Sequence, residues 1–160
     1  MTNAGRTRSF GGEIAVRWAP WQSLVFNGSY GYTNAKFLKY DDGKENYRGK
    51  RLPYAPSNTL FLQCLYSLNS AALGDNSIVF DLNMRGTGNI YWNEANSLSQ
   101  PFYALLGASV TFKAPKWELQ LWGKNLTATD YYTLYFMSIG NEFLQRGNKI
   151  NAGLVLRVFI

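Results

Sequence analysis

The chain has 160 residues, the size of one domain or of a piece of a larger one, and its aromatic and charged residues each make up 16%. This composition excludes a disordered chain, and no apolar run is long enough for a transmembrane helix. With no histidine and one cysteine, Cys64, the chain lacks a Ser-His-Asp triad, a histidine-based metal site, a thiolate zinc cluster and an internal disulfide. This inventory argues against an enzyme, and we expect neither a cofactor nor a resident metal. The net charge of +6 is modest, so the placement of basic residues matters more than their number.

Alternation of apolar and polar residues with a period of two recurs along the whole chain, and helical periodicity is hard to find. In the first such segment Phe10, Ile14 and Trp18 share one face, while Glu13 and Arg17 share the other. Later segments repeat this arrangement, and most have one apolar and one polar face. The pattern predicts seven β-strands, over residues 9–18, 24–33, 59–68, 78–85, 106–112, 117–124 and 151–160.

The connections between the predicted strands alternate between short and long. Short ones cover 19–22, 69–76 and 113–116, and long ones cover about 38–57, 86–101 and 126–148. The periplasmic turns and extracellular loops of an outer-membrane barrel alternate in this way. Aromatic residues also gather near the strand ends, as a membrane interface favours. A soluble β-barrel binding module, which would bury the apolar faces inside, is an alternative interpretation.

The number of strands suggests that the barrel is incomplete. Single-chain bacterial barrels have even numbers of strands, and a sheet of seven would close only by pairing two strands that run the same way. Unpaired edges are costly in lipid. The polar N-terminal segment has no apolar signal-peptide core, so the chain either stays in the cytoplasm or begins inside a longer precursor. We interpret the chain as the last part of a larger barrel. A complete small outer-membrane barrel with a structural or adhesive role is a second interpretation, and it would need an eighth strand folded from Leu134 to Leu144.

Four segments, in order, resemble motifs of the C-terminal region of TonB-dependent outer-membrane receptors. They are the strand and turn Gly11–Pro20, the strand entry Arg51–Thr59, the strand Trp117–Leu126 with the tyrosines that follow it, and the entry Gln145–Gly147 into the last strand. The chain ends Phe159–Ile160, so the terminal aromatic of the family is displaced by one residue. The resemblance implies an all-β fold in which residues 1–160 are the C-terminal part of a 22-stranded antiparallel barrel, with the plug domain, TonB box and earlier strands absent.

The same resemblance implies a receptor in the bacterial outer membrane that binds and imports a scarce ligand. A ferric siderophore ranks first, ahead of cobalamin and an oligosaccharide. This chain would supply barrel wall and external loops and would not transport alone, because TonB acts through the missing plug. The implied partners are outer-membrane lipid and lipopolysaccharide, the remainder of the barrel, the plug and a small-molecule ligand. No nucleic acid is expected, because the basic residues lie mainly in loops while many aromatics share faces with aliphatics.

Three of the eight candidate ligand-binding residues, Arg48, Lys50 and Arg51, lie in the first long connection. The segment 38–52 has a net charge of +2, from Lys39, Lys44 and these three against Asp41, Asp42 and Glu45. Its charge suits an anionic ferric complex. A solvated loop that touches lipopolysaccharide phosphates is the interpretation that we prefer. The three acidic residues do not match the calcium-loop pattern, so no metal is assigned.

The other five candidates are in the second and third long connections. Tyr91 and Trp92 form an aromatic pair that would stack on sugar or catecholate rings, or else belong to a girdle at the membrane interface. Tyr131 and Tyr132 would cap a ligand or be buried within the loop. Arg146 would meet a carboxylate or phosphate, although a salt bridge at the rim is the preferred interpretation.

Overall fold

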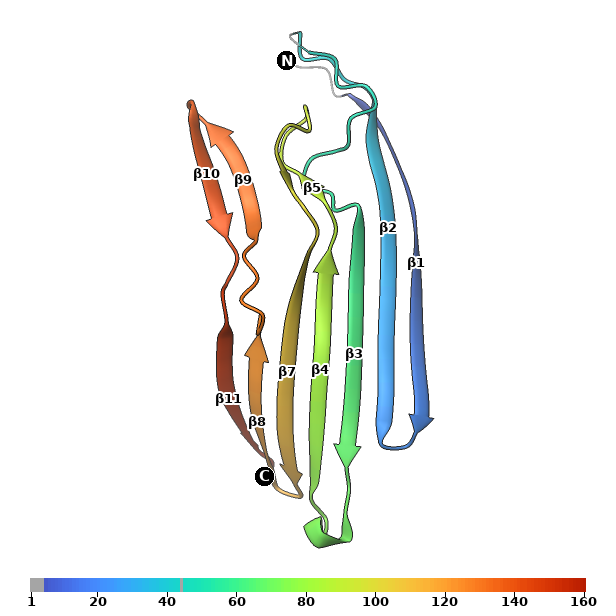
Figure 1. Ribbon diagram of the computed structural model, residues 1–160, viewed down its shortest axis with the longest axis vertical. Helices are drawn as coiled ribbons and strands as arrows, with labels where there is room; N and C mark the ends of the chain where they lie inside the picture. Colours follow the sequence, from blue (N-terminus) through green and yellow to red (C-terminus); the bar gives the residue numbers. More distant parts are fainter. Residues whose placement is uncertain (1–4, 44) are drawn as a thin grey trace.

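The chain folds into one large antiparallel β-sheet with two small hairpins at one end, in a computed structural model that describes residues 5–43 and 45–160 (Figure 1). Lys44 and the first residues of the N-terminal segment lie outside the described residues. The large sheet has seven strands, and their order across the sheet is their order along the chain. The strands are β1 (Arg6–Trp21), β2 (Leu24–Lys39), β3 (Asn58–Leu68), β4 (Ser77–Thr87), β7 (Tyr103–Ala114), β8 (Trp117–Lys124) and β11 (Asn151–Val158). The predicted seven-stranded meander is confirmed.

The register of the strands gives the sheet one apolar and one polar face. Phe26 lies opposite Cys64, which lies opposite Leu82, whereas the adjacent Asn27 lies opposite Gln63. Successive residues of a strand point to opposite faces, so these pairings continue across the sheet. The apolar face includes Val16, Trp18, Val110, Leu121 and Leu154, and the polar face includes Arg17, Asp81, Ser109, Gln120 and Arg157.

Nothing in the described part of the chain covers the apolar face. Leu121 and Leu154 are each 62% exposed, and Leu82 is 51% exposed. The accessible surface is 11190 Å², whereas a compact protein of 18.1 kDa would expose roughly 8100 Å². The described residues include no large side chain that is completely buried. A soluble module would enclose these aliphatic side chains, so the structure argues against that alternative.

The two ends of the sheet carry different connections. At the lower end in Figure 1, β1 leads directly into β2 through Gln22 and Ser23, and β7 leads into β8 through Pro115 and Lys116. The turn between β3 and β4 contains the 3-10 helix η1 (Ala71–Leu73). The three long connections all lie at the upper end. The predicted alternation is therefore confirmed, although β1 and β2 extend further than the sequence pattern indicated.

Two of the long connections contain hairpins that the sequence did not predict. β5 (Ile90–Tyr91) pairs with β6 (Ser99–Gln100), and β9 (Tyr132–Ser138) pairs with β10 (Asn141–Arg146). The idea of an eighth barrel strand from Leu134 to Leu144 is wrong, because this segment folds back on itself and joins no strand of the large sheet. Its turn residues, Ile139 and Gly140, both have positive φ, the conformation of a tight hairpin turn.

The first and last strands of the sheet, β1 and β11, do not pair with each other, so the described chain is an open sheet rather than a closed barrel.

Near the lower end of the apolar face, three aromatic pairs lie on successive hairpins, with ring centroids 5.2–6.3 Å apart: Trp18–Phe26, Tyr66–Phe80 and Phe112–Trp117. These aromatic pairs form a row, and an aromatic girdle at a membrane interface would lie at this level of the sheet. Within residues 5–43 and 45–160, no helix has the length and apolar character needed to cross a membrane.

Candidate functional site

A ladder of hydrogen-bonded side chains crosses the polar face from β2 to β4. Asn27 Nδ2 donates to Gln63 Oε1 at 2.9 Å, and Gln63 Nε2 donates to Asp81 Oδ2 at 2.5 Å. Asn83 Nδ2 donates to Asp81 Oδ1 at 2.7 Å. Both carboxylate oxygens of Asp81 therefore accept a hydrogen bond from an amide. Such a surface is stable beside water or another polar surface and costly beside lipid.

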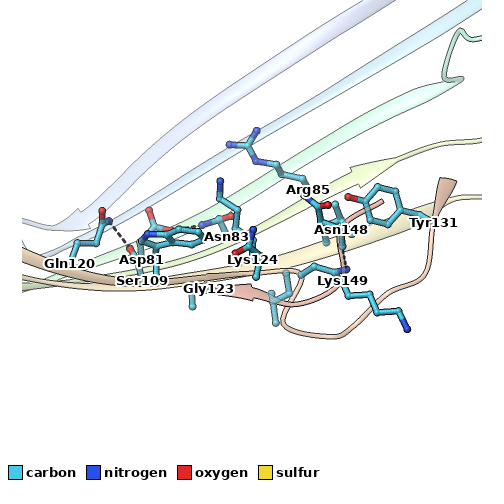
Figure 2. A pocket seen from close by; sticks show the side chains of 17 residues that line it. Asp81, Asn83, Arg85, Ser109, Gln120, Gly123, Lys124, Tyr131, Asn148 and Lys149 are labelled. Atoms are coloured by element: carbon cyan, nitrogen blue, oxygen red, sulfur yellow. Dashed lines mark hydrogen bonds between the residues drawn. The ribbon is translucent and has the colours of Figure 1, made fainter. Parts of the chain in front are cut away.

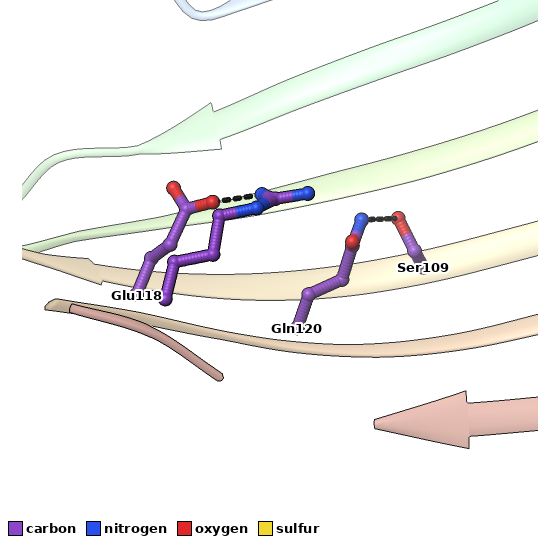
Figure 3. Close-up of polar contacts among 4 residues, drawn as sticks. Ser109, Glu118 and Gln120 are labelled. Carbon is purple, nitrogen blue, oxygen red and sulfur yellow. Dashed lines mark hydrogen bonds and ion pairs between the residues drawn. The ribbon is translucent and has the colours of Figure 1, made fainter. Parts of the chain in front are cut away.

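A second set of polar contacts joins the last three strands near the lower end of the same face (Figure 3). Glu118 on β8 and Arg157 on β11 lie opposite each other in the register and form an ion pair. Gln120 Nε2 donates a hydrogen bond to Ser109 Oγ on β7 at 3.2 Å. These partners satisfy one another, so we assign them to strand register rather than to ligand binding.

From the Gln120–Ser109 hydrogen bond upward, the polar face is hollowed by a cavity of about 650 Å³. Its floor is formed by β4, β7 and β8, and the two ends of the last long connection form its rim (Figure 2). Arg85, Trp122 and Lys124 project from the strands, and Tyr131 and Asn148 come from the connection. The cavity therefore combines cationic, aromatic and amide groups drawn from distant parts of the chain.

The cavity is electropositive. Arg85, Lys124 and Lys149 line it, and Asp81 is the one acidic residue of the lining. The Arg85 guanidinium carbon lies 5.3 Å from the centroid of the Phe61 ring, and Lys124 Nζ lies 5.2 Å from that of Trp122. Among the described residues, neither cation has a carboxylate partner within ion-pair distance. Cations held on aromatic faces keep a positive charge that attracts anions.

Tyr131 is wedged between an aromatic ring and a glycine at the cavity rim. Its ring stacks on Tyr103, with centroids 4.6 Å apart and 19° between the planes. A Cβ on Gly147 would overlap the Tyr131 ring, so only glycine fits there without movement of the tyrosine. This packing explains the glycine in the sequence motif that leads into the last strand.

Asn125, in the motif at the end of β8, organises the other side of the rim. The buried side chain accepts a hydrogen bond from Thr129 N at 2.9 Å and donates one to Thr129 O at 3.0 Å. The same Nδ2 donates to Asn148 O at 2.9 Å. One asparagine thus ties the beginning of the last long connection to its end and fixes the position of Asn148 beside the cavity.

The basic candidates of the first long connection lie away from this cavity. Lys50 Nζ donates to Ala95 O at 2.9 Å. The backbone of Arg51 exchanges two hydrogen bonds with the Asn96 side chain, at 2.7 Å and 2.9 Å. Lys50 and Arg51 therefore help to join the first long connection to the second, whereas Arg48 is exposed on the first.

Two tyrosines of the long connections have raised pKa values. Tyr47 donates its hydroxyl to Asp42 Oδ2 at 2.8 Å, and this hydrogen bond to a carboxylate raises the pKa of Tyr47 to about 12. Burial, followed by the nearby carboxylate of Glu142, raises the pKa of Tyr135 above its ordinary value. Both shifts favour the neutral form of the tyrosine and extend it to higher pH than usual.

The predicted aromatic pair is part of a junction among all three long connections. Trp92 is only 7% exposed, and its ring packs edge-on against Tyr54 with centroids 5.7 Å apart. Tyr54 N donates to Tyr91 O at 2.8 Å, and Tyr54 Oη donates to Tyr135 O at 2.9 Å. Tyr54 has a φ of 62°, a strained conformation that these contacts compensate. The sequence reasoning missed Tyr54, although it lies within one of the quoted motifs.

The last two candidates lie on the β9–β10 hairpin. The Arg146 guanidinium carbon lies 6.0 Å from the centroid of the Tyr132 ring, and Tyr132 N donates to Gln100 Oε1 at 3.0 Å. Of the eight candidates, the structure brings only Tyr131 to the electropositive cavity. Ligand contact by any of the eight stays a prediction. Arg85 and Lys124 also line the cavity, and neither was a candidate from the sequence. The one sequence feature that could have indicated them is their position on the polar faces of predicted strands.

Comparison with known proteins agrees with this fold. The structure resembles the ferric yersiniabactin uptake receptor FyuA from Yersinia pestis, with a TM-score of 0.84 and 20% identity over 98% of this chain and 24% of that chain. It also resembles the siderophore receptor PiuA from Acinetobacter baumannii, with a TM-score of 0.73 and 17% identity over 96% of this chain and 22% of that chain. A third similar structure is the ferric-catecholate import receptor Fiu from E. coli K12, with a TM-score of 0.67 and 21% identity over 95% of this chain and 21% of that chain.

The chain spans about a quarter of the length of the solved receptors that it matches. Residues 1–126 match the family described as TonB dependent receptor-like, β-barrel. The matched family is described as receptor-like, and each of the three similar structures is named as a receptor. The chain therefore belongs to the TonB-dependent receptor β-barrel family.

Proposed function

We propose that the chain forms part of the wall and three external loops of an outer-membrane receptor for a ferric siderophore. We further propose that the cavity around Arg85 and Lys124 receives the anionic ferric complex. The observation that carries this proposal is the electropositive, aromatic-lined cavity of about 650 Å³ beneath the last long connection. Its cations attract an anion, and its rings suit the aromatic groups of a catecholate. The names of the similar solved receptors favour an iron-carrying ligand.

The two faces of the sheet support placement in the outer membrane. The apolar face is uncovered and has an aromatic row at its lower end, as a lipid-facing wall requires. The polar face carries the amide ladder, which needs water or protein beside it. In this placement the polar face borders the barrel interior, and the long connections lie outside the cell.

Import of the ligand would require more than this chain. The proposal includes the remaining barrel strands, which would pair with the free edges of β1 and β11. It also includes a plug that would fill the interior beside the polar face and transmit the action of TonB. The alternative of a small self-contained barrel with a structural or adhesive role is less well supported, because the two edges do not meet.

Ligand binding by the intact protein that carries these residues tests the proposal. The probes are a ferric tris-catecholate complex, cyanocobalamin and a maltodextrin, each titrated against detergent-solubilised protein by isothermal titration calorimetry. The test variant is R85Q/K124Q. The matched control is K113Q/K116Q, which removes the same charge at the opposite end of the sheet.

We expect the ferric complex to bind best, and we expect R85Q/K124Q to weaken its binding at least about tenfold, because each lost cation removes a charge-assisted interaction. The control should bind as the unaltered protein does. Equal binding by R85Q/K124Q would refute the assignment of the cavity. Binding of cyanocobalamin or maltodextrin in preference to the ferric complex would refute the ligand class.

A further inference from the structure

Three basic residues lie in one row on the apolar face, at the end of the sheet that carries the long connections. Arg8 on β1 lies directly opposite Lys36 on β2. Lys36 in turn forms an antiparallel bridge with Arg51, on the segment that continues the sheet beyond β3. Directly paired residues point to the same face, with their Cβ atoms about 5 Å apart. Three positive charges therefore lie side by side across three adjacent segments.

This arrangement is unfavourable without a counter-charge. Like charges directly opposite each other on a sheet destabilise it. In the described part of the chain, none of the three forms an ion pair with an acidic side chain. Arg8 and Lys36 are exposed, and Arg51 is half-buried. An anion from outside the chain would relieve the repulsion.

Two of the three cations are held in place by neighbours. The Arg8 guanidinium carbon lies 5.6 Å from the centroid of the Phe10 ring on the same face. The Asn96 side chain fixes the backbone of Arg51 on both sides, and Arg51 Nη1 donates to Thr33 O at 3.4 Å. The row is thus partly preorganised, which lowers the cost of binding an anion.

The position of the row along the strand matches one edge of a membrane. Arg8 precedes Trp18, in the lower aromatic row, by ten residues of β1. Ten residues of strand span about 34 Å, and a tilt of about 40° reduces the height to about 25 Å. That height equals the apolar band of an outer-membrane barrel, about 25 Å. The basic row therefore lies at the level of lipid headgroups when Trp18 lies at the opposite interface.

We propose that Arg8, Lys36 and Arg51 bind the phosphate groups of a phosphorylated lipid in the outer leaflet of the membrane. This inference rests on the membrane placement argued above and concerns the outward face, not the ligand cavity. Two guanidinium groups suit phosphate because they donate paired hydrogen bonds to its oxygens. Phosphate in a lipid and free phosphate share this chemistry, but only the lipid also places acyl chains on the apolar face below the row.

The test uses the intact protein in detergent micelles, with bound lipid counted by native mass spectrometry. The probes are bis-phosphorylated lipid A, the same lipid without phosphates, and inorganic phosphate. The variant R8Q/K36Q/R51Q removes the row. The control R17Q/K113Q/K116Q removes the same charge from the polar face and from the opposite end of the sheet.

We expect R8Q/K36Q/R51Q to weaken binding of the phosphorylated lipid at least about tenfold, because each basic residue near an anionic lipid surface adds to affinity. The control variant should bind it as the unaltered protein does, and the phosphate-free lipid should bind all three proteins equally weakly. Equal binding by R8Q/K36Q/R51Q, or an equal loss in the control, would overturn the proposal. Displacement of the lipid by equimolar inorganic phosphate would identify free phosphate as the ligand and overturn the lipid assignment.

Two measurements on the unaltered protein keep the test decisive if the variant does not fold. Binding of the phosphorylated lipid should weaken steeply as salt rises from about 0.05 M to about 0.5 M, because salt screens exposed charges. Binding that is independent of salt would overturn the proposal.

Insertion into phosphatidylcholine vesicles tests the underlying membrane placement. Failure to insert would refute the membrane assignment as well as the lipid site. Insertion without any preference for phosphorylated lipid would refute only the assignment of the basic row.

Discussion

Replacing adjacent residues of β8 with arginine should have opposite consequences for stability. Leu121 lies on the apolar face and is 62% exposed, whereas Gln120 lies on the polar face. Leu121 is four residues above Trp117, so it lies about 10 Å above the aromatic row and near the middle of a band about 25 Å tall. Arginine on the lipid face at that depth costs about 2–4 kcal/mol. Arginine on a wet face costs about 0.5 kcal/mol or less.

The assay is urea unfolding of the intact protein in lipid vesicles, followed by tryptophan fluorescence. We expect Leu121→Arg to lower the free energy of unfolding by about 2–4 kcal/mol. Gln120→Arg should change it little, apart from the lost hydrogen bond to Ser109, worth about 1 kcal/mol. If Leu121 faced water, its substitution would be nearly neutral, since the side chain has few neighbours to lose. A destabilisation by Gln120→Arg that exceeds that by Leu121→Arg would refute the assignment of the two faces.

Three further predictions concern polar contacts and loops. Asp81→Ala leaves the amides of Gln63 and Asn83 without their acceptor. It should therefore lower the free energy of unfolding by about 1–3 kcal/mol in the same urea assay. An unchanged free energy of unfolding would contradict the hydrogen-bond ladder around Asp81. Gly147→Ala should push Tyr131 off Tyr103 at a cost of about 1–3 kcal/mol, seen as a changed near-ultraviolet circular dichroism spectrum. Tyr47 should ionise near pH 12 in the ultraviolet difference spectrum against Tyr47→Phe, and nearer its ordinary pKa of 10.0 in an Asp42→Ala background. Because the folded-state pKa is raised, its stabilising contribution is present below pH 10 and is lost as pH rises through about 12.

The wall of the sheet could be predicted from the sequence because its signal is local. Alternation with a period of two assigns each residue to a face without knowledge of its neighbours, so Glu118, Gln120 and Leu121 were placed correctly. Short turns are equally visible, since strands separated by few residues must pair as hairpins. The strand ends were less clear: β1 and β2 continue into polar residues at the upper end, where alternation no longer marks burial.

The cavity could not be predicted because it depends on register. Arg85 and Lys124 are far apart in sequence, and only the pairing of β4, β7 and β8 brings them to one surface. A shift of one residue in either pairing would move one of them to the opposite face. The basic row on the apolar face has the same origin, since Arg8 and Arg51 become neighbours only through Lys36.

The long connections were also beyond sequence reasoning. Trp92 was a candidate for stacking on a ligand, and sequence patterns did not indicate that its ring is buried against Tyr54. Nothing in the local sequence shows that Tyr54 has a positive φ and contacts both other connections. The β9–β10 hairpin turns at Ile139 and Gly140, and a β-branched residue with positive φ is a rare turn residue that sequence patterns do not favour.

Accessibility of spin labels along β8 would test the central claim, that one face of the sheet contacts lipid and the other faces the barrel interior. Single cysteines would be placed at each position from 117 to 122 in a Cys64→Ala background and labelled in the intact protein in lipid vesicles. Collision with oxygen, which concentrates in lipid, should be high at Trp117, Leu119 and Leu121. Collision with oxygen should be low at the three positions between and after them, which point away from lipid, and any collision with a water-soluble nickel chelate should be confined to these three positions. Accessibility that is uniform along the strand, or that alternates in the opposite phase, would contradict the claim.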